Sequence, residues 1–205
     1  MNSYFLVFDL ETTNNPDRNH RHEIIEIAAI TVNNGIINER DFFHTLVRPP
    51  CRIQPRNFQV SGISDFMVEK APTIDQVLPD LLSFLGEYPL IGHNIATFDS
   101  RVLNEHLEDH GYPKLTNVIL DTMILSKKLF KGEKSHNLDA IMQRLGIQKS
   151  SGQRHRAMED VRCTALVFLK LIEVLKGNGI TTLEGVDRFC NEDPKTIKEQ
   201  QTKLF

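Results

Sequence analysis

The chain opens with an apolar segment that ends in two acidic residues. The run over residues 4–10 is rich in aromatic and branched side chains, which predicts a buried strand. Asp9 and Glu11 are two positions apart, so on a strand their side chains leave from the same face. Because two neighbouring carboxylates repel each other, one takes up a proton unless a cation offsets the pair. Mg²⁺ and Mn²⁺ prefer carboxylate oxygens, so the pair indicates a metal site at the end of a strand, with two solvated acids in a turn as the alternative.

Length and composition place the chain among ordinary globular proteins. Its 205 residues fit one domain with a sizeable core, and 40% hydrophobic and 25% charged residues are typical of a soluble protein. The net charge of −3 argues against indiscriminate binding to polyanions but leaves room for a local basic groove. Cys51, Cys163 and Cys190 match no zinc or redox spacing, which suits a reducing, cytoplasmic location. The first residues carry no positive flank and acids interrupt the apolar run, so we expect neither a secretory signal nor a membrane span.

The pattern of apolar residues predicts an α/β fold. Further strands are expected over residues 24–32, 36–47, 90–92 and 118–120, and helices over residues 73–86, 98–110, 122–130, 137–145 and 156–176. The turn signal Asn-Asn-Gly at residues 33–35 joins two of the strands as a hairpin, and the prolines over residues 49–55 break regular structure. Three strands followed by alternating helices and strands predict a mixed sheet of about five strands flanked by helices. The polar residues 177–205 predict a short helical extension of unknown role.

Two further acids fall where functional groups gather in such sheets. Asp99 follows a predicted strand and opens a helix, and Asp160 lies in the first turns of the helix at 156–176. Functional groups in α/β sheets gather at the carboxyl ends of the strands, and the apolar stripe of the long helix places Asp160 next to its inward face. Four converging carboxylates can hold two divalent ions, which stabilise the attacking and leaving oxygens in phosphodiester cleavage. His155, in the loop before the long helix, is a candidate general base for a metal-bound water.

The number, order and separation of these residues resemble the DEDDh exonucleases of the DnaQ type, which share a ribonuclease H-like fold. Asp-Leu-Glu-Thr-Thr at residues 9–13 is similar to the first motif, His93-Asn94 with Phe98-Asp99 to the second, and His155-x-Ala157-x-x-Asp160 to the third. Supporting stretches at residues 23–29, 61–65, 71–73, 120–122 and 136–139 are similar as well. The resemblance covers about residues 4–175, which assigns an exonuclease domain to residues 1–176 and leaves the extension outside it.

The resemblance implies a role for each motif. It implies two Mg²⁺ or Mn²⁺ ions at one site. The implied metal ligands are Asp9, Glu11, Asp99 and Asp160. The implied general base is His155. The implied candidates for substrate binding are Thr12, Thr13, Ile63, His93 and Asn94. For His93 and Asn94, hydrogen bonds that tie the strand end are the structural alternative. The implied activity is removal of nucleoside 5′-monophosphates from the 3′ ends of single-stranded DNA or RNA.

The resemblance of a shorter stretch bears on the substrate and on the partner. DNA is favoured over RNA because residues 61–73 resemble polymerase-associated exonucleases such as the proofreading epsilon subunit of DNA polymerase III, which also makes a DNA polymerase a candidate partner. Two alternatives stay open: an RNA-trimming exoribonuclease, and a non-catalytic polymerase-associated interaction module. All five catalytic positions are filled, which argues against the module.

Two departures from the family pattern bear on these assignments. The first motif is followed by a longer loop instead of the usual early glycine. This loop carries Arg18, His20, Arg21 and His22, and it keeps RNA trimming open as an alternative. In the second motif three residues, 95–97, separate His93-Asn94 from Phe98 where many relatives have two, which bears on the placement of Asp99.

The surroundings of the predicted site offer further candidate contacts. Residues 127–156 contain eight Lys and Arg and two acids, a net charge of +6, which predicts a rim that contacts phosphates, or else a solvated surface. Phe58, Phe66 and Phe98 are candidates for stacking on bases, although phenylalanine more often belongs to a core. Asp121 is expected to cap the helix that follows it.

Overall fold

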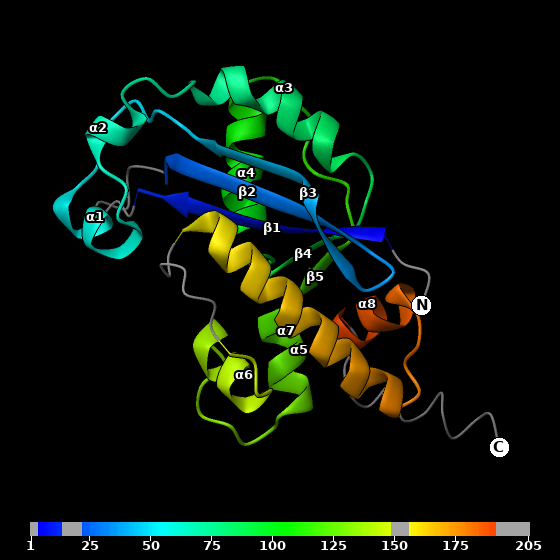
Figure 1. The fold of residues 1–205 in the computed structure, drawn as a ribbon. Coiled ribbons are helices and arrows are strands. Elements are labelled where there is room, and N and C mark those ends of the chain that lie inside the picture. The colour runs from blue at the N-terminus through cyan, green and yellow to red at the C-terminus, as the bar shows by residue number, and fades with distance from the viewer. Residues whose placement is uncertain (1–3, 14–21, 149–155, 192–205) are drawn as a thin grey trace.

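The computed structural model describes residues 4–13, 22–148 and 156–191. A five-stranded sheet lies at its centre, with the strand order β3-β2-β1-β4-β5 (Figure 1). The strands are β1 (Tyr4–Thr12), β2 (Ile24–Asn33), β3 (Ile36–Leu46), β4 (Leu90–Gly92) and β5 (Ile119–Asp121). The predicted mixed α/β sheet of about five strands is therefore confirmed.

The sheet is antiparallel on one side of β1 and parallel on the other. β2 pairs antiparallel with both β1 and β3, whereas β4 pairs parallel with β1 and with β5. The β2–β3 hairpin turns at Asn34 and Gly35, whose φ values of 52° and 81° are the positive angles that a two-residue turn of this kind needs. Because β1, β4 and β5 run in the same direction, their carboxyl ends meet at one edge, where the motif residues follow the strands.

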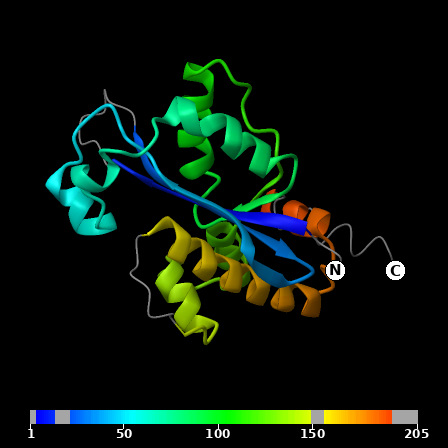
Figure 2. The same cartoon turned by 45° about the horizontal axis from the view of Figure 1, so that its top comes forward.

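Helices cover both faces of the sheet. On one face lie α3 (Ile74–Leu85) and α4 (Asp99–Asp109), and on the other α5 (Thr122–Leu129), α6 (Leu138–Arg144) and α7 (Ala157–Gly177), as Figure 2 shows. Alternate residues of β1 enter the two layers, since Phe5 and Val7 pack in the core with α7 while Leu6 and Phe8 pack in the core with α3 and α4. All five helices lie where the sequence predicts them. Among the described residues, no helix combines the length and apolar character that spanning a bilayer requires.

The described residues form three further helices in addition to these five. α1 (Pro55–Ser61) and α2 (Asp65–Val68) follow β3, where the sequence predicted only irregular structure. The prediction was wrong because Pro55 begins α1 in the first turn, a position at which proline removes no intrahelical hydrogen bond. α8 (Leu183–Asn191) lies in the predicted extension and buries Val186 and Cys190 in the same core as α7.

Gly92, at the end of β4, lies too close to its neighbours to carry a side chain. A methyl group at this position would lie 2.5 Å from Cβ of Ile95 and 3.0 Å from the backbone oxygen of Phe8. Both neighbours are buried, so we expect Gly92→Ala to lower the free energy of unfolding by about 2–3 kcal/mol in urea titrations. Gly177→Ala is the control, because no atom lies within 4 Å of its added methyl group. Equal urea midpoints for the two variants would contradict the close approach.

Candidate functional site

Three carboxylates converge at the carboxyl end of β1. Asp9 and Glu11 lie on the face of β1 that packs against α7, and Asp160 lies in the first turn of α7. Oxygens of the three side chains lie within 4.8 Å of one another. Because Mg²⁺ binds oxygen at about 2.1 Å, one ion between them can contact all three. The structure thus brings together three of the four predicted carboxylates, and their binding of metal stays a prediction.

Asp99 is held beside this group by a hydrogen bond to β1. It begins α4, it is 4% exposed, and its Oδ1 accepts a hydrogen bond from the backbone N–H of Leu10 at 3.1 Å. Leu10 lies between Asp9 and Glu11, so the bond ties the first turn of α4 to the strand that carries both acids. Asp99 is not one of the three residues whose oxygens lie within 4.8 Å of one another. It adds a fourth carboxylate at the same edge of the sheet, where Asp9 and Glu11 are partly buried and Asp160 is buried.

The crowding of these acids opposes their ionisation. Burial raises the pKa of Asp9 well above its usual value, and the neighbouring carboxylates, first that of Asp99, raise it further. Burial and the charge of Asp160 raise the pKa of Glu11 to about 8. Burial raises the pKa of Asp99 to about 7. At neutral pH without a cation the site therefore retains protons, and binding of a divalent ion releases them.

The candidate general base cannot be placed in this geometry. His155 lies outside the described residues, as do Arg18, His20 and Arg21 of the loop after β1. The described chain resumes at Arg156, the N-cap residue of α7, one position after His155 and four before Asp160. The role of His155 therefore stays a prediction.

The second motif forms a hydrogen-bonded corner between β4 and α5. The carboxylate of Asp121 caps α5 by accepting from the N–H groups of Met123 and Ile124, as expected. The same carboxylate accepts from the N–H groups of Asn94 and Ala96, both at 3.1 Å. Nδ1 of His93 lies 3.0 Å from the hydroxyl of Thr122. These contacts favour the structural alternative for His93 and Asn94.

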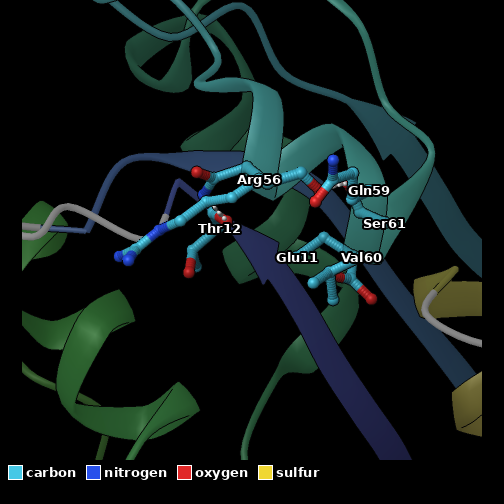
Figure 3. Close-up of a pocket in the computed structure, with 7 residues that line it drawn as sticks. Glu11, Thr12, Arg56, Gln59, Val60 and Ser61 are labelled. Atoms are coloured by element: carbon cyan, nitrogen blue, oxygen red, sulfur yellow. Dashed lines mark hydrogen bonds between the residues drawn. The ribbon is translucent and has the colours of Figure 1, made fainter.

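A pocket of about 240 Å³ opens beside Glu11, between the end of β1 and α1. Figure 3 shows Thr12 below Arg56, and Glu11 beside Val60. Asn57 ties the two elements together, because its side-chain amide donates to the carbonyl oxygen of Thr12 at 3.3 Å. Of the two neighbouring threonines, Thr12 and Thr13, it is Thr12 that lines this pocket.

Thr13 and Ile63 lie away from the pocket. Thr13 is 3% exposed, and its hydroxyl accepts a hydrogen bond from the N–H of Glu23 at 3.0 Å, so it secures the chain on the far side of the loop. Ile63 is 0% exposed, in a small core with Ile25, Ile53 and Val68. Its proposed place near the terminal base stays a prediction, and in this structure its side chain packs in that core. Val60, three residues earlier, has 54% of its surface exposed and lines the pocket instead.

Part of the predicted basic rim is engaged in contacts within the protein. Arg144 donates to Glu133 and to the carbonyl oxygen of Ser135, and Lys128 donates to the carbonyl oxygen of Phe189. Among the residues of this stretch that the structure describes, the exposed basic side chains are those of Lys127, Lys131 and Lys134. Phe58 and Phe66, the candidate stacking residues on α1 and α2, are 50% and 84% exposed.

One buried acid next to the site is not among the residues predicted from the sequence. Glu26 lies on β2 opposite Glu11 and is 0% exposed. Its carboxylate binds the guanidinium of Arg156, one of the eight basic residues of the predicted rim. The sequence signal for this buried acid is its position as the single acid inside the apolar run Ile-Ile-Glu-Ile-Ala.

Known proteins are similar to this chain in sequence and in fold. Residues 6–168 match the family model described as exonuclease. The chain is 36% identical over 187 residues to the DNA polymerase III PolC-type protein of Thermotoga petrophila, a match that covers 91% of this chain and 13% of that protein. It is 35% identical over 171 residues to the DNA polymerase III subunit epsilon of Aquifex aeolicus, which covers 83% of this chain and 81% of that protein. The chain therefore spans only about an eighth of the PolC-type relative's length.

Solved structures of nucleases have the same architecture. Exonuclease X in complex with 5′ overhanging duplex DNA matches with a TM-score of 0.71 and 25% identity, over 91% of this chain and 99% of that chain. The nuclease domain of 3′hExo, a DEDDh family member bound to rAMP, matches with a TM-score of 0.71 and 20% identity, over 84% and 92% of the two chains. The ribonuclease H-like fold expected from the sequence motifs is thereby confirmed.

Proposed function

We propose that this chain, which belongs to the exonuclease family, removes nucleoside 5′-monophosphates from the 3′ ends of nucleic acid strands. The observation that carries the proposal is the convergence of Asp9, Glu11 and Asp160, whose oxygens lie within 4.8 Å of one another. They meet at the carboxyl edge of the sheet beside a pocket, so a strand end held in the pocket lies next to the acids. The proposed reaction is hydrolysis of the last phosphodiester bond.

The donor set fits hard divalent cations. Asp9, Glu11, Asp99 and Asp160 offer only carboxylate oxygens, which suit Mg²⁺ or Mn²⁺, and we propose two ions per site. Such ions, when bound, stabilise negative charge on the attacking and leaving oxygens. The protein's own contribution is to hold the acids together, with His155 proposed to take the proton from the attacking water.

The pocket suits the end of a single strand. Val60 offers an apolar surface for a sugar or base, and Thr12 and Gln59 offer polar groups beside it. Contacts of this kind hold a strand end without reading its sequence, so we expect little sequence preference. We propose DNA as the favoured substrate and a DNA polymerase as a partner, because relatives at 35–36% identity are DNA polymerase III proteins. Degradation of RNA is the second candidate, since a nuclease with the same fold binds rAMP.

A labelled-strand assay tests the proposal. Matched single-stranded DNA and RNA, labelled at the 5′ end, are incubated with the protein and Mn²⁺ or with EDTA. We expect a ladder that shortens from the 3′ end, only with Mn²⁺, and faster on DNA. Asp160→Asn is expected to leave both strands intact.

Each other outcome of this assay points elsewhere. Faster loss of RNA would replace DNA by RNA as the substrate. Fragments cut from internal positions would contradict an exonuclease. Binding of the strands without cleavage in Mn²⁺ would favour the non-catalytic interaction module.

A further inference from the structure

Glu26 is a fully buried carboxylate on the strand next to the site. It lies on β2 directly opposite Glu11 in the antiparallel register, with 0% of its surface exposed. The other β2 residues from Ile24 to Val32 are apolar except Thr31. Burial of a charge is costly unless the charge is paired and hydrogen-bonded. A lone acid in such a strand therefore requires a specific partner.

That partner is the start of α7. The guanidinium of Arg156 donates to both oxygens of Glu26, from Nε at 3.2 and 3.1 Å and from Nη2 at 2.7 Å. The backbone N–H of Ala157 donates to Oε2 at 3.0 Å, and Nε2 of His44 on β3 lies 2.8 Å from Oε1. Burial acts to raise the pKa of Glu26, but these hydrogen bonds together lower it to about 2. Glu26 is therefore ionised, and both of its oxygens are engaged.

Glu26 supplies the cap that α7 lacks in its own sequence. The N-cap residue Arg156 makes no side-chain capping hydrogen bond. The first N–H groups of a helix have no partner within the helix, and Glu26 accepts that of Ala157 from 131 positions away. A carboxylate at this end of a helix also interacts favourably with the helix dipole. The strand β2 thus fixes the point at which α7 begins.

The position of Asp160 follows from that point. The N–H of Asp160 donates to the carbonyl oxygen of Arg156 at 3.0 Å, so the two residues are one turn apart. A displacement of the helix start therefore displaces the Asp160 carboxylate with it. Because functional sites must hold their groups within about 0.5 Å, small displacements of this kind weaken ion binding.

We propose that Glu26 is a positioning residue for the exonuclease site, and that the positive charge of Arg156 offsets the negative charge of Glu26 beside that site. The inference rests on the proposed function, since the group that it serves is Asp9, Glu11 and Asp160. Glu26 fixes the first turn of α7 and hence Asp160 against β1. Arg156 offsets a negative charge that otherwise adds to that of Glu11, directly across the two strands.

Two substitutions separate positioning from general stability. Glu26→Gln keeps the shape of the side chain but removes its charge and leaves Arg156 close to Glu11. Arg156→Lys keeps the positive charge but loses the two-pronged hydrogen bonding. The matched control is Arg162→Gln, because Arg162 also joins α7 to β3, through Glu39 at 3.0 Å, in a pair that is 38% and 55% exposed.

The main readout is Mn²⁺ affinity by isothermal titration calorimetry in the absence of substrate. We expect Glu26→Gln to weaken Mn²⁺ binding roughly tenfold or more, and Arg156→Lys to weaken it by a smaller factor. Arg162→Gln is expected to bind Mn²⁺ like the wild type. In steady-state assays Glu26→Gln should lower kcat while the KM for the oligonucleotide stays unchanged, because α1 and the pocket are not touched.

The outcomes distinguish this inference from the proposed function. Wild-type Mn²⁺ affinity and kcat in a folded Glu26→Gln protein would overturn it. If Glu26→Gln does not fold, Arg156→Lys decides, since weakened Mn²⁺ binding supports positioning and wild-type binding refutes it. A wild-type protein that neither binds Mn²⁺ nor shortens strands would overturn both proposals, whereas an active wild type with unaffected variants overturns only this one.

Discussion

Asp9→Asn is expected to release nucleotides at least about 10²-fold more slowly than the wild type, and yet to melt at a higher temperature in EDTA. The loss of rate follows if Asp9 is the proposed oxygen ligand, since stabilisation of transition-state charge by bound ions is worth several kcal/mol. The gain in stability follows from the surroundings of Asp9. Burial and the charges of its neighbours raise the pKa of Asp9 well above its usual value, so the negative carboxylate destabilises the metal-free fold. Asparagine has the same shape without the charge.

The opposite signs of the two effects make Asp9→Asn a sharp test. Differential scanning calorimetry in EDTA should show a rise in Tm, and strand-shortening assays in Mn²⁺ should show the loss of rate. Asp80→Asn is the matched control, because Asp80 lies exposed on α3 and should change neither quantity. An Asp9→Asn protein that melts below the wild type in EDTA would contradict the mutual repulsion of the acids.

The features that short-range patterns encode were predictable from the sequence. The alternation along β1 places Asp9 and Glu11 on one face without knowledge of any other element. The prediction of Asp160 needed only the apolar stripe that packs α7 on the sheet. The cap at Asp121 was predictable for the same reason, because it depends on residues that follow it directly.

Features that depend on distant contacts were not predictable in this way. Pro55 suggested irregular chain but begins α1, and this helix turns Val60 toward the pocket while Ile63 enters the core. The pairing of Glu26 with Arg156 joins residues 130 positions apart, and no local pattern marks the two as partners. The sequence therefore predicts which acids meet, but not the buried ion pair that fixes one of them in place.

The metal-free protein is expected to lose stability as the pH rises from about 5 to about 8. The pKa of Glu11 is raised from 4.5 to about 8, because the side chain is buried near Asp160, and burial raises that of Asp99 from 3.8 to about 7. Between these values the folded protein holds protons that the unfolded chain has released, so the free energy of unfolding falls with rising pH. Glu26 acts in the opposite direction, because its pKa of about 2 gives stability that is lost below about pH 4.5. For these three groups together, we expect stability without metal to be highest near pH 4–5.

Urea titrations in EDTA at several pH values measure this slope. We expect the free energy of unfolding to fall by on the order of 3 kcal/mol between about pH 5 and pH 8. Millimolar Mn²⁺ should flatten the decline, because a cation bound only by the folded state replaces the protons and stabilises it. Glu11→Gln should flatten the decline in EDTA as well, since it removes the group with the pKa of about 8. A metal-free wild type that gains stability over this pH range would show that the acids do not share one site.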